Sequence, residues 1–189
     1  TTEQIAYPIM KKIFENRGIA EAPLLAHSYE RVMPGKHYVS SVRDYWRVCS
    51  GIDEPSRDRV VRFLEEVLNT KEYPLTVLER PIESETAKII ENSYRSAILA
   101  FMDEWSLFAE RNGIDLKKVI EAIKVRPTHS NMIFPGPGIG GYCLPKDGAL
   151  GAWSYRHILG WEDEIFRFTP HSIDINDMRS LHVPQMVRD

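Results

Sequence analysis

The sequence lacks an excess of positive charge, a long apolar run and a secretory leader pattern. Its 24 lysine and arginine residues are outnumbered by 27 aspartate and glutamate residues, so the net charge is −3 over 189 residues. Nucleic-acid-binding domains carry clusters of basic residues, and this balance therefore argues against a nucleic-acid partner. No apolar stretch approaches the length of a membrane-spanning helix, so we expect no membrane partner either.

Cysteine is also scarce, with only Cys49 and Cys143 present. Their even number allows a disulfide, but a chain of this length with 43% apolar residues can bury a core without one. Cys49 ends an apolar, strand-like run, and we expect it to be a buried packing residue. His129 and His157 do not complete a set with the spacing of a zinc site, so no metal is expected. Low cysteine usage of this kind indicates the cytoplasm.

The first eighty residues alternate short apolar strands with helices. We expect helices at residues 3–16 and 58–68, and strands at residues 23–27, 44–49 and 75–78. This alternation predicts an α/β segment, but it offers too few strands for a complete doubly wound sheet. A partial Rossmann-like sheet is therefore the expected architecture of this part.

The pattern changes after residue 81. Residues 84–111 contain neither glycine nor proline, which predicts one long helix, capped near Ser84 and ended by Gly113. Its apolar stripe recurs at three- and four-residue spacing and consists of Ile90, Tyr94, Ile98, Phe101, Trp105 and Phe108. The stripe must be buried, either within the chain, for example against a short helix at 116–123, or against a second copy of the long helix. Further helices are expected at 149–159 and from 173 to 187, the last interrupted or kinked at Pro184.

The densest group of reactive residues lies in the segment Phe134-Pro-Gly-Pro-Gly-Ile-Gly-Gly-Tyr-Cys-Leu-Pro-Lys-Asp147. Its glycines let the backbone approach a ligand where side chains would not fit. Cys143, Lys146 and Asp147 fall within five positions. They offer a thiol nucleophile, a cation that favours the thiolate and a carboxylate that can handle a proton. This combination is typical of covalent thiol chemistry.

The same glycines also fit the pattern G-x-G-x-x-G, at Gly136, Gly138 and Gly141. A dinucleotide-binding fingerprint should close a strand and open a helix, whereas two prolines interrupt this segment and Cys-Leu-Pro follows it. We interpret the match as accidental. A glycine-rich connection without chemistry of its own is the third interpretation of the segment.

Two smaller groups stand upstream. Lys88 and Asn92 are four residues apart on the long helix, so both side chains emerge from one face. In isolation such a pair is typical of a solvated face. Glu30 and Arg31 follow a predicted strand, where a carboxylate would lie at the mouth of a sheet, although a surface ion pair is the simpler interpretation.

Taken in order, these groups resemble the UDP-glucose/GDP-mannose dehydrogenase family. Its members carry a strand-end glutamate in a PER-like motif, a K-x-x-x-N on the central helix and a cysteine loop of the form GPGxGGxCxxKD. The chain's opening Thr1-Thr2-Glu3 is similar to the end of the family's PGTTE segment, and Ile175-Asn-Asp177 to the start of its helix into the last domain. The resemblance covers essentially the whole chain.

The resemblance implies a domain organisation. Residues 1–80 would be the C-terminal part of the NAD-binding Rossmann-like domain. Residues 81–189 would be the central helical, dimer-forming and catalytic domain, built on the long helix like the C-terminal domain of 6-phosphogluconate dehydrogenase. The C-terminal nucleotide-sugar-binding domain would be absent, as would the N-terminal cofactor fingerprint. We therefore expect the isolated chain to bind neither NAD+ nor a UDP-sugar.

It also implies an activity, the NAD-dependent oxidation of the C6 alcohol of a UDP-sugar to the uronate. Cys143 would attack the intermediate aldehyde to give a thiohemiacetal and then a thioester, which water hydrolyses. Lys88 and Asn92 would stabilise charge on the reacting oxygen, and Asp147 with Glu30 would position water or accept its proton. Expected substrate-binding residues are Arg31, Gly138, Gly140, Gly141 and Lys146.

Three positions depart from the family pattern. Tyr29 stands where a proline usually precedes the glutamate, Tyr142 where polysaccharide-type members often have histidine, and His129 approximately where they have arginine. The sugar therefore stays open between UDP-N-acetylhexosamine, which Glu30-Arg-Val-Met-Pro-Gly35 favours, and UDP-glucose. The alternative functions are a non-catalytic helical dimerisation module and, more distantly, a relative of the hydroxyacid dehydrogenases.

Overall fold

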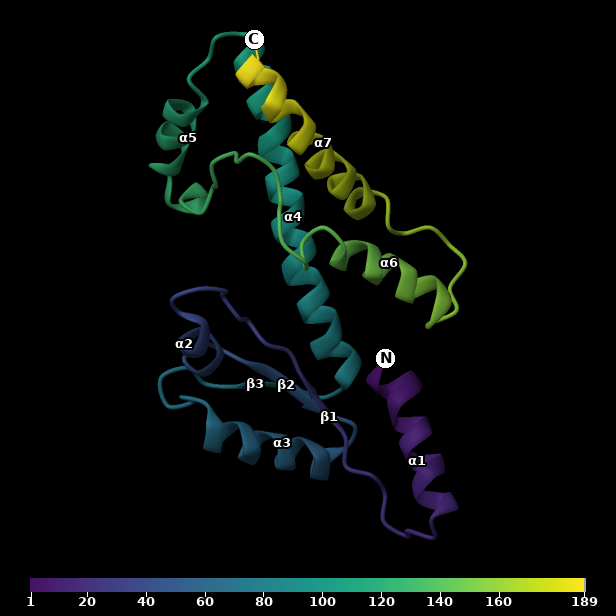
Figure 1. Cartoon of the computed structure of the whole chain (residues 1–189). Helices are drawn as coiled ribbons and strands as arrows, with labels where there is room; N and C mark the ends of the chain where they lie inside the picture. Colours follow the sequence, from purple (N-terminus) through teal and green to yellow (C-terminus); the bar gives the residue numbers. More distant parts are fainter. Residues whose placement is uncertain (189) are drawn as a thin grey trace. The chain divides into compact units, whose positions relative to one another are not determined.

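The structure is a computed structural model that describes residues 1–188, except for the side chains of residues 186 and 187 (Figure 1). The chain forms two compact units, of which the first comprises residues 1–88 and the second starts at Ile89. The fold is an α/β segment with a small sheet, followed by an all-α part built on one long helix.

The first unit contains the sheet. Its elements are η1 (Thr2–Ala6), α1 (Tyr7–Asn16), β1 (Ala26–Ser28), α2 (Tyr38–Arg43), β2 (Val48–Gly51), α3 (Glu54–Val67), β3 (Thr76–Leu78) and the first turns of α4 (Pro81–Arg111). The strand order is β1-β2-β3, with β1 antiparallel and β3 parallel to β2. The central strand β2 is buried along its whole length, and α3 packs on it.

Cys49 illustrates this burial. It pairs with Ser28 on one side and Val77 on the other, and its side chain is 0% exposed. The prediction that Cys49 is a packing residue is confirmed. Both cysteines are free, so the disulfide that their number allowed is not formed.

Several boundaries in the first unit differ from the predictions. Helix α3 begins at Glu54, four residues early, because Asp53 caps it by accepting a hydrogen bond from the Ser56 N–H (2.9 Å) and a proline occupies its first turn. The short helix α2 was not predicted. The strand expected at 44–49 starts later, since β2 spans Val48–Gly51.

The second unit contains the rest of α4, α5 (Leu116–Lys124), η2 (Pro127–His129), α6 (Asp147–His157) and α7 (Phe168–Arg188). The single long helix is confirmed, and Gly113, at φ +64°, ends it as predicted. It starts at Pro81, three residues before the expected cap at Ser84. The carboxylate of Glu83 accepts from the N–H groups of Glu79 and Arg80, which is the role expected of Ser84.

Helix α7 lies along α4 in the second unit (Figure 1), joined to it through Asn176 and Arg179. It starts at Phe168, five residues before the predicted start. The predicted interruption at Pro184 is wrong, since the helix runs on to Arg188. A proline there removes only its own N–H, whose acceptor would be the carbonyl of Ser180, an exposed residue that water can reach.

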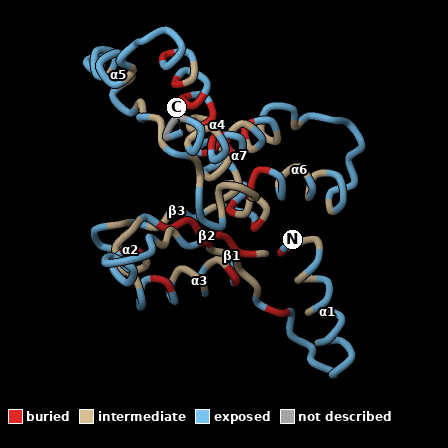
Figure 2. Tube along the Cα trace, turned by 45° about the horizontal axis from the view of Figure 1, so that its top comes forward, coloured by how far each residue is buried: buried red, intermediate tan, exposed pale blue. Residues whose placement is uncertain are grey.

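The second unit has buried positions on α4, α5, α6 and α7, and those on α4 and α7 are among the red segments of Figure 2. The apolar stripe on α4 is instead exposed, at 61% for Ile90, 58% for Tyr94, 51% for Phe101, 49% for Trp105 and 51% for Phe108. Among the described residues neither α5 nor any other element covers these five side chains. Of the two predicted ways to bury the stripe, the one within the chain is wrong for them.

Candidate active site

The strongest cluster of the second unit is centred on Asp147, the first residue of α6. Its side chain is 8% exposed. One carboxylate oxygen accepts from the side-chain amide of Asn92 on α4 (2.6 Å), and the other accepts from the ammonium of Lys146 (2.7 Å). Three residues singled out in the sequence are thus brought into direct contact, and the carboxylate is fixed on both sides.

Cys143 lies four residues before Asp147 and is half-buried. Its carbonyl accepts from the backbone N–H groups of Lys146 (3.2 Å) and Asp147 (2.9 Å), which closes a turn leading into α6. The ammonium of Lys146 binds Asp147 and lies 4.7 Å from the ring centre of Tyr142. The hydrogen bond to Asp147 raises the pKa of Lys146, so this side chain keeps its positive charge beside the cysteine turn.

The glycine-rich segment between η2 and α6 has the backbone freedom that its composition predicts. Gly138 and Gly141 have φ values of +120° and +86°, where side chains are disfavoured. A 3-10 turn precedes the segment in the described chain, not a strand, so the G-x-G-x-x-G match lacks the strand–turn–helix context of a fingerprint. Gly140 is exposed, and a Cβ added there would meet nothing within 4 Å.

The first unit places Lys88 beside Glu30. The Lys88 ammonium donates to the Glu30 carbonyl (3.0 Å) and lies 4.0 Å from its carboxylate, which is 48% exposed. That carboxylate also accepts from the backbone N–H of Val32. The simpler interpretation of Glu30, a surface ion pair, agrees with this half-exposed contact to Lys88. Arg31 donates to the Trp46 carbonyl, at 2.6 Å.

Tyr29 was noted in the sequence only as a departure from a proline. It is buried, at 7% exposure, and its hydroxyl accepts from Arg31 (2.9 Å). Its ring centre lies 5.2 Å from the Arg31 guanidinium and 5.5 Å from the Lys88 ammonium. Cations at this distance from an aromatic face are attracted to it. The tyrosine therefore helps to hold two of the predicted site residues.

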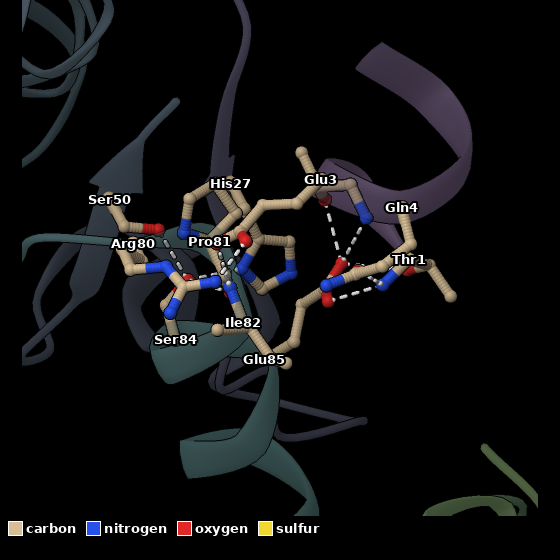
Figure 3. Close-up of polar contacts among 11 residues, drawn as sticks. Thr1, Glu3, Gln4, His27, Ser50, Arg80, Pro81, Ile82, Ser84 and Glu85 are labelled. Carbon is tan, nitrogen blue, oxygen red and sulfur yellow. Dashed lines mark hydrogen bonds and ion pairs between the residues drawn. The ribbon is translucent and has the colours of Figure 1, made fainter. Parts of the chain in front are cut away.

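Sequence reasoning missed a polar network at the start of α4 (Figure 3). Glu85 accepts from the N–H (2.9 Å) and hydroxyl (2.7 Å) of Thr2, while Glu3 accepts from the Ile82 N–H (3.1 Å). Each glutamate thus caps the helix that carries the other. Burial opposes ionisation of Glu85, but the hydrogen bond from the Thr1 ammonium (2.6 Å), together with those from Thr2 and the Thr1 hydroxyl, prevails and lowers its pKa to about 2. The sequence feature that could have indicated this network is Glu85 itself, a glutamate one turn before Lys88 on the same helix.

A second chain of hydrogen bonds joins the sheet to the same turn of α4. The Ser84 hydroxyl lies 2.7 Å from His27 Nδ1 and 2.6 Å from the Ser50 hydroxyl, and it donates to the Pro81 carbonyl. Burial lowers the pKa of His27, which favours its neutral form. The strand that leads to Glu30 is thereby tied to the helix that carries Lys88.

Two features are absent from the described part of the chain. No group of three or more histidine, cysteine, aspartate or glutamate side chains in residues 1–188 is placed to hold a metal ion. Of the helices in those residues, none combines the length and the apolar content that crossing a membrane requires.

Comparison with known proteins matches residues 82–176 to the central domain of the UDP-glucose/GDP-mannose dehydrogenase family. UDP-N-acetyl-D-mannosamine dehydrogenase from Methanocaldococcus jannaschii is 33% identical over 74% of the chain and 30% of its own length. The crystal structure of NDP-N-acetyl-D-galactosaminuronic acid dehydrogenase from Methanosarcina mazei Go1 is similar at 28% identity, with a TM-score of 0.78 over 99% of this chain and 40% of that one.

A structure of UDP-D-ManNAc dehydrogenase from Pyrococcus horikoshii, 24% identical, has the same fold, with a TM-score of 0.73 over 97% of this chain and 42% of that one. The chain thus spans less than half the length of these relatives. The family match covers half of the sequence, and the order of the three groups agrees with it. The chain is therefore a member of the UDP-glucose/GDP-mannose dehydrogenase family.

Proposed function

We propose that this chain supplies the thiol-bearing part of an NAD-dependent nucleotide-sugar 6-dehydrogenase. The enzyme would oxidise the C6 alcohol of a UDP-sugar, either a UDP-N-acetylhexosamine or UDP-glucose, to the uronate. Membership of the family supports this, as do relatives named for UDP-N-acetyl-D-mannosamine and NDP-N-acetyl-D-galactosaminuronic acid. Free thiols and the lack of a disulfide fit a cytoplasmic location.

The observation that carries the proposal is the fixed carboxylate of Asp147, one turn beyond Cys143. In the reaction the Cys143 sulfur would add to the C6 aldehyde carbon, forming a C–S bond while the carbonyl oxygen takes up a proton. Loss of a hydride from that carbon and of the proton from its hydroxyl leaves a thioester. Asp147 would then accept a proton from the water that attacks the thioester carbonyl. The C–S bond breaks, and the thiol and the uronate are released.

The other predicted site residues have roles that fit their contacts. Lys88 and Asn92 would donate to the oxygen on which negative charge develops. Glu30 would assist Asp147 with the water. Arg31, Lys146, Gly138, Gly140 and Gly141 would contact the substrate.

Two hydrides leave each sugar, and the acceptor that the family resemblance implies is NAD+. The described residues do not form a site that fits it. Their sheet has three strands of mixed direction, and the only glycine-rich turn in residues 1–188 follows a 3-10 helix. A dinucleotide site needs such a turn at a helix N-terminus beside a parallel sheet. We propose that NAD+ and the nucleotide are held by other parts of a longer protein, and that this chain alone is inactive.

A homodimer is the second proposal, supported by the exposed stripe on α4. Five large apolar side chains at helical spacing form a patch that a soluble protein rarely leaves open. Pairing with the same stripe of a second copy would cover it in a two-fold, self-complementary interface. If this were the chain's only role, it would be a non-catalytic dimerisation module. Light scattering should show a dimer that Trp105→Asp converts to a monomer, and a monomeric parent chain would contradict the proposal.

The activity is tested in a gene product that carries this chain together with its nucleotide-binding parts. Cys143→Ser should lower uronate formation from UDP-sugars and NAD+ by roughly a hundredfold or more, because the thioester cannot form. Cys49→Ala is the matched control and should keep the rate. Uronate formation that survives Cys143→Ser would overturn the mechanism. Calorimetry of the chain alone should show no NAD+ binding.

A further inference from the structure

The segment that carries Cys143 makes little use of its own backbone. Along residues 133–145, all of which the structure describes, no backbone N–H donates to a backbone carbonyl. Three of these residues are prolines and have no N–H to offer. The conformation of the segment therefore depends on side chains that reach it from neighbouring helices.

Two cations do so before the cysteine turn. Lys124, at the end of α5, donates to the Met132 carbonyl (3.1 Å). Arg179, on α7, donates through Nε to the Gly136 carbonyl (3.2 Å). Next to Arg179 on α7, the backbone of Ser180 comes close to Gly138, where an added Cβ would lie 3.5 Å from the Ser180 nitrogen. The loop thus contacts α7 at two places, through the hydrogen bond from Arg179 to Gly136 and through the close approach of Gly138 to Ser180.

Arg179 is itself held firmly. Its side chain is 8% exposed and lies between two carboxylates of α4, with Nε 3.6 Å from Asp103 and Nη2 3.5 Å from Glu110. Glu110 is held in turn by His182 (2.7 Å) and by the Ser106 hydroxyl (3.2 Å). Nη1 is buried without a hydrogen-bond partner among the described residues. This guanidinium therefore has a fixed orientation, set by α4.

We propose that Arg179 is a positioning residue, which transmits the packing of α4 against α7 to the loop and so limits access to the Cys143 thiol. A buried, braced arginine suits this role because its planar fork can reach carboxylates and a carbonyl at once. A role of Arg179 in the oxidation rests on the proposed function. Its role in holding the loop does not depend on that function, and alkylation of Cys143 tests the loop alone.

The competing explanation is that Arg179 only neutralises the buried carboxylate of Asp103. Burial raises the pKa of Asp103, and the charge of Arg179 acts in the opposite direction. Removing the arginine alone would leave a buried charge without its partner and lower stability in either case. Arg179→Met must therefore be compared with Arg179→Met combined with Asp103→Asn, which removes both charges.

The experiment measures alkylation of Cys143 and Cys49 by iodoacetamide in the intact chain, with urea unfolding in parallel. In both variants, iodoacetamide should alkylate Cys143 about fivefold faster or more. This increase is expected when a contact worth about 1 kcal/mol no longer holds the segment of residues 133–145 in place. Cys49 should keep its rate. The double variant should unfold at a urea concentration closer to that of the parent than the single variant does. Arg167→Met, which removes an exposed arginine just before α7, is the matched control and should change neither rate.

An unchanged Cys143 rate in the double variant overturns the proposal, whatever the single variant does. A rise confined to Arg179→Met and accompanied by lower stability assigns Arg179 to charge balance, which also overturns it. If Arg179 controls the alkylation rate while Cys143→Ser leaves uronate formation intact, the positioning stands and the proposed function fails.

Discussion

The two cysteines show how differently the two units treat the same side chain. Cys49 lies in the central strand of the sheet, is 0% exposed, and burial raises the pKa of its thiol. Cys143 is half-buried in a segment whose N–H groups donate to no backbone carbonyl, and its own carbonyl accepts from two N–H groups at the start of α6. A strand uses cysteine as a small apolar residue, whereas a side-chain-held loop presents it for chemistry.

The carboxylates of the two units differ in the same direction. Asp147 accepts hydrogen bonds at 2.6 and 2.7 Å on its two oxygens and is almost fully buried. Glu30 is half exposed and meets Lys88 only at 4.0 Å. A carboxylate whose two oxygens are both held in place suits the same proton transfer in every catalytic cycle. An exposed carboxylate suits a role that assists this transfer. Substitutions at these carboxylates and cysteines test the contrast between the two units.

The largest effect is expected from Asp147→Asn. The amide cannot accept a proton from water, so uronate formation by a gene product with complete nucleotide sites should fall by roughly 10²- to 10⁴-fold. Glu30→Gln, the matched change in the other unit, should reduce the rate less. The assay follows NADH and uronate together. Equal losses from the two changes would remove the distinction between the carboxylates.

A smaller effect concerns Glu85, whose pKa is lowered to about 2 from an ordinary 4.5. A lowered pKa stabilises the fold above pH 4.5, and this contribution is lost as the pH falls toward 2. Glu85→Gln should therefore cost roughly 2–3 kcal/mol at neutral pH. Urea unfolding from pH 7 to 3 should show the difference between parent and variant shrinking below pH 4.5. A difference that does not vary with pH would contradict the ionised contacts with Thr1 and Thr2.

Serine substitutions compare the two cysteines directly. Cys49→Ser places a hydroxyl in a fully buried strand and should lower the free energy of unfolding by about 1–3 kcal/mol. Cys143→Ser should stay within about 0.5 kcal/mol, because its side chain is only half-buried in a loop. Urea denaturation of both variants measures this. Similar costs would mean that Cys143 is a packing residue as well.

The smallest effect is expected for the stability contribution of the Lys88–Glu30 pair. An ion pair that is half exposed and 4.0 Å apart should contribute less than about 1 kcal/mol, and less still at high salt. A double-mutant cycle with Lys88→Met and Glu30→Gln isolates the pair. A coupling above that limit would show that Glu30 is held as firmly as Asp147.

Local signals in the sequence accounted for much of this fold. The uninterrupted residues 84–111 predicted α4, Gly113 predicted its end, and the short helix expected at 116–123 is found at Leu116–Lys124. Boundaries were missed where the determining partner is not the apolar pattern, as with the Asp53 cap of α3. The short helix α2 has too few apolar residues for a periodicity to be recognised.

The site was predictable in part for similar reasons. The spacing of Cys143, Lys146 and Asp147 is local, and the family resemblance implied that Asn92 and Asp147 belong to the site, but not that they contact each other. The contacts of Glu85 with Thr2 and of Arg179 with Gly136 join residues far apart in the chain, and no local pattern indicates them. The sequence shows that Tyr29 stands where the family usually has a proline. It does not show that the Tyr29 ring contacts Arg31 and Lys88.

The central claim is that Cys143 is presented for chemistry and Cys49 is not. Its most direct test is competitive labelling of the native chain with a small amount of iodoacetamide, followed by peptide mass spectrometry. The account predicts that Cys143 is modified first and that Cys49 reacts only when urea unfolds the sheet, because its thiol is buried and its pKa raised. Modification of Cys49 at the rate of Cys143, or ahead of it, in the folded chain would contradict the account.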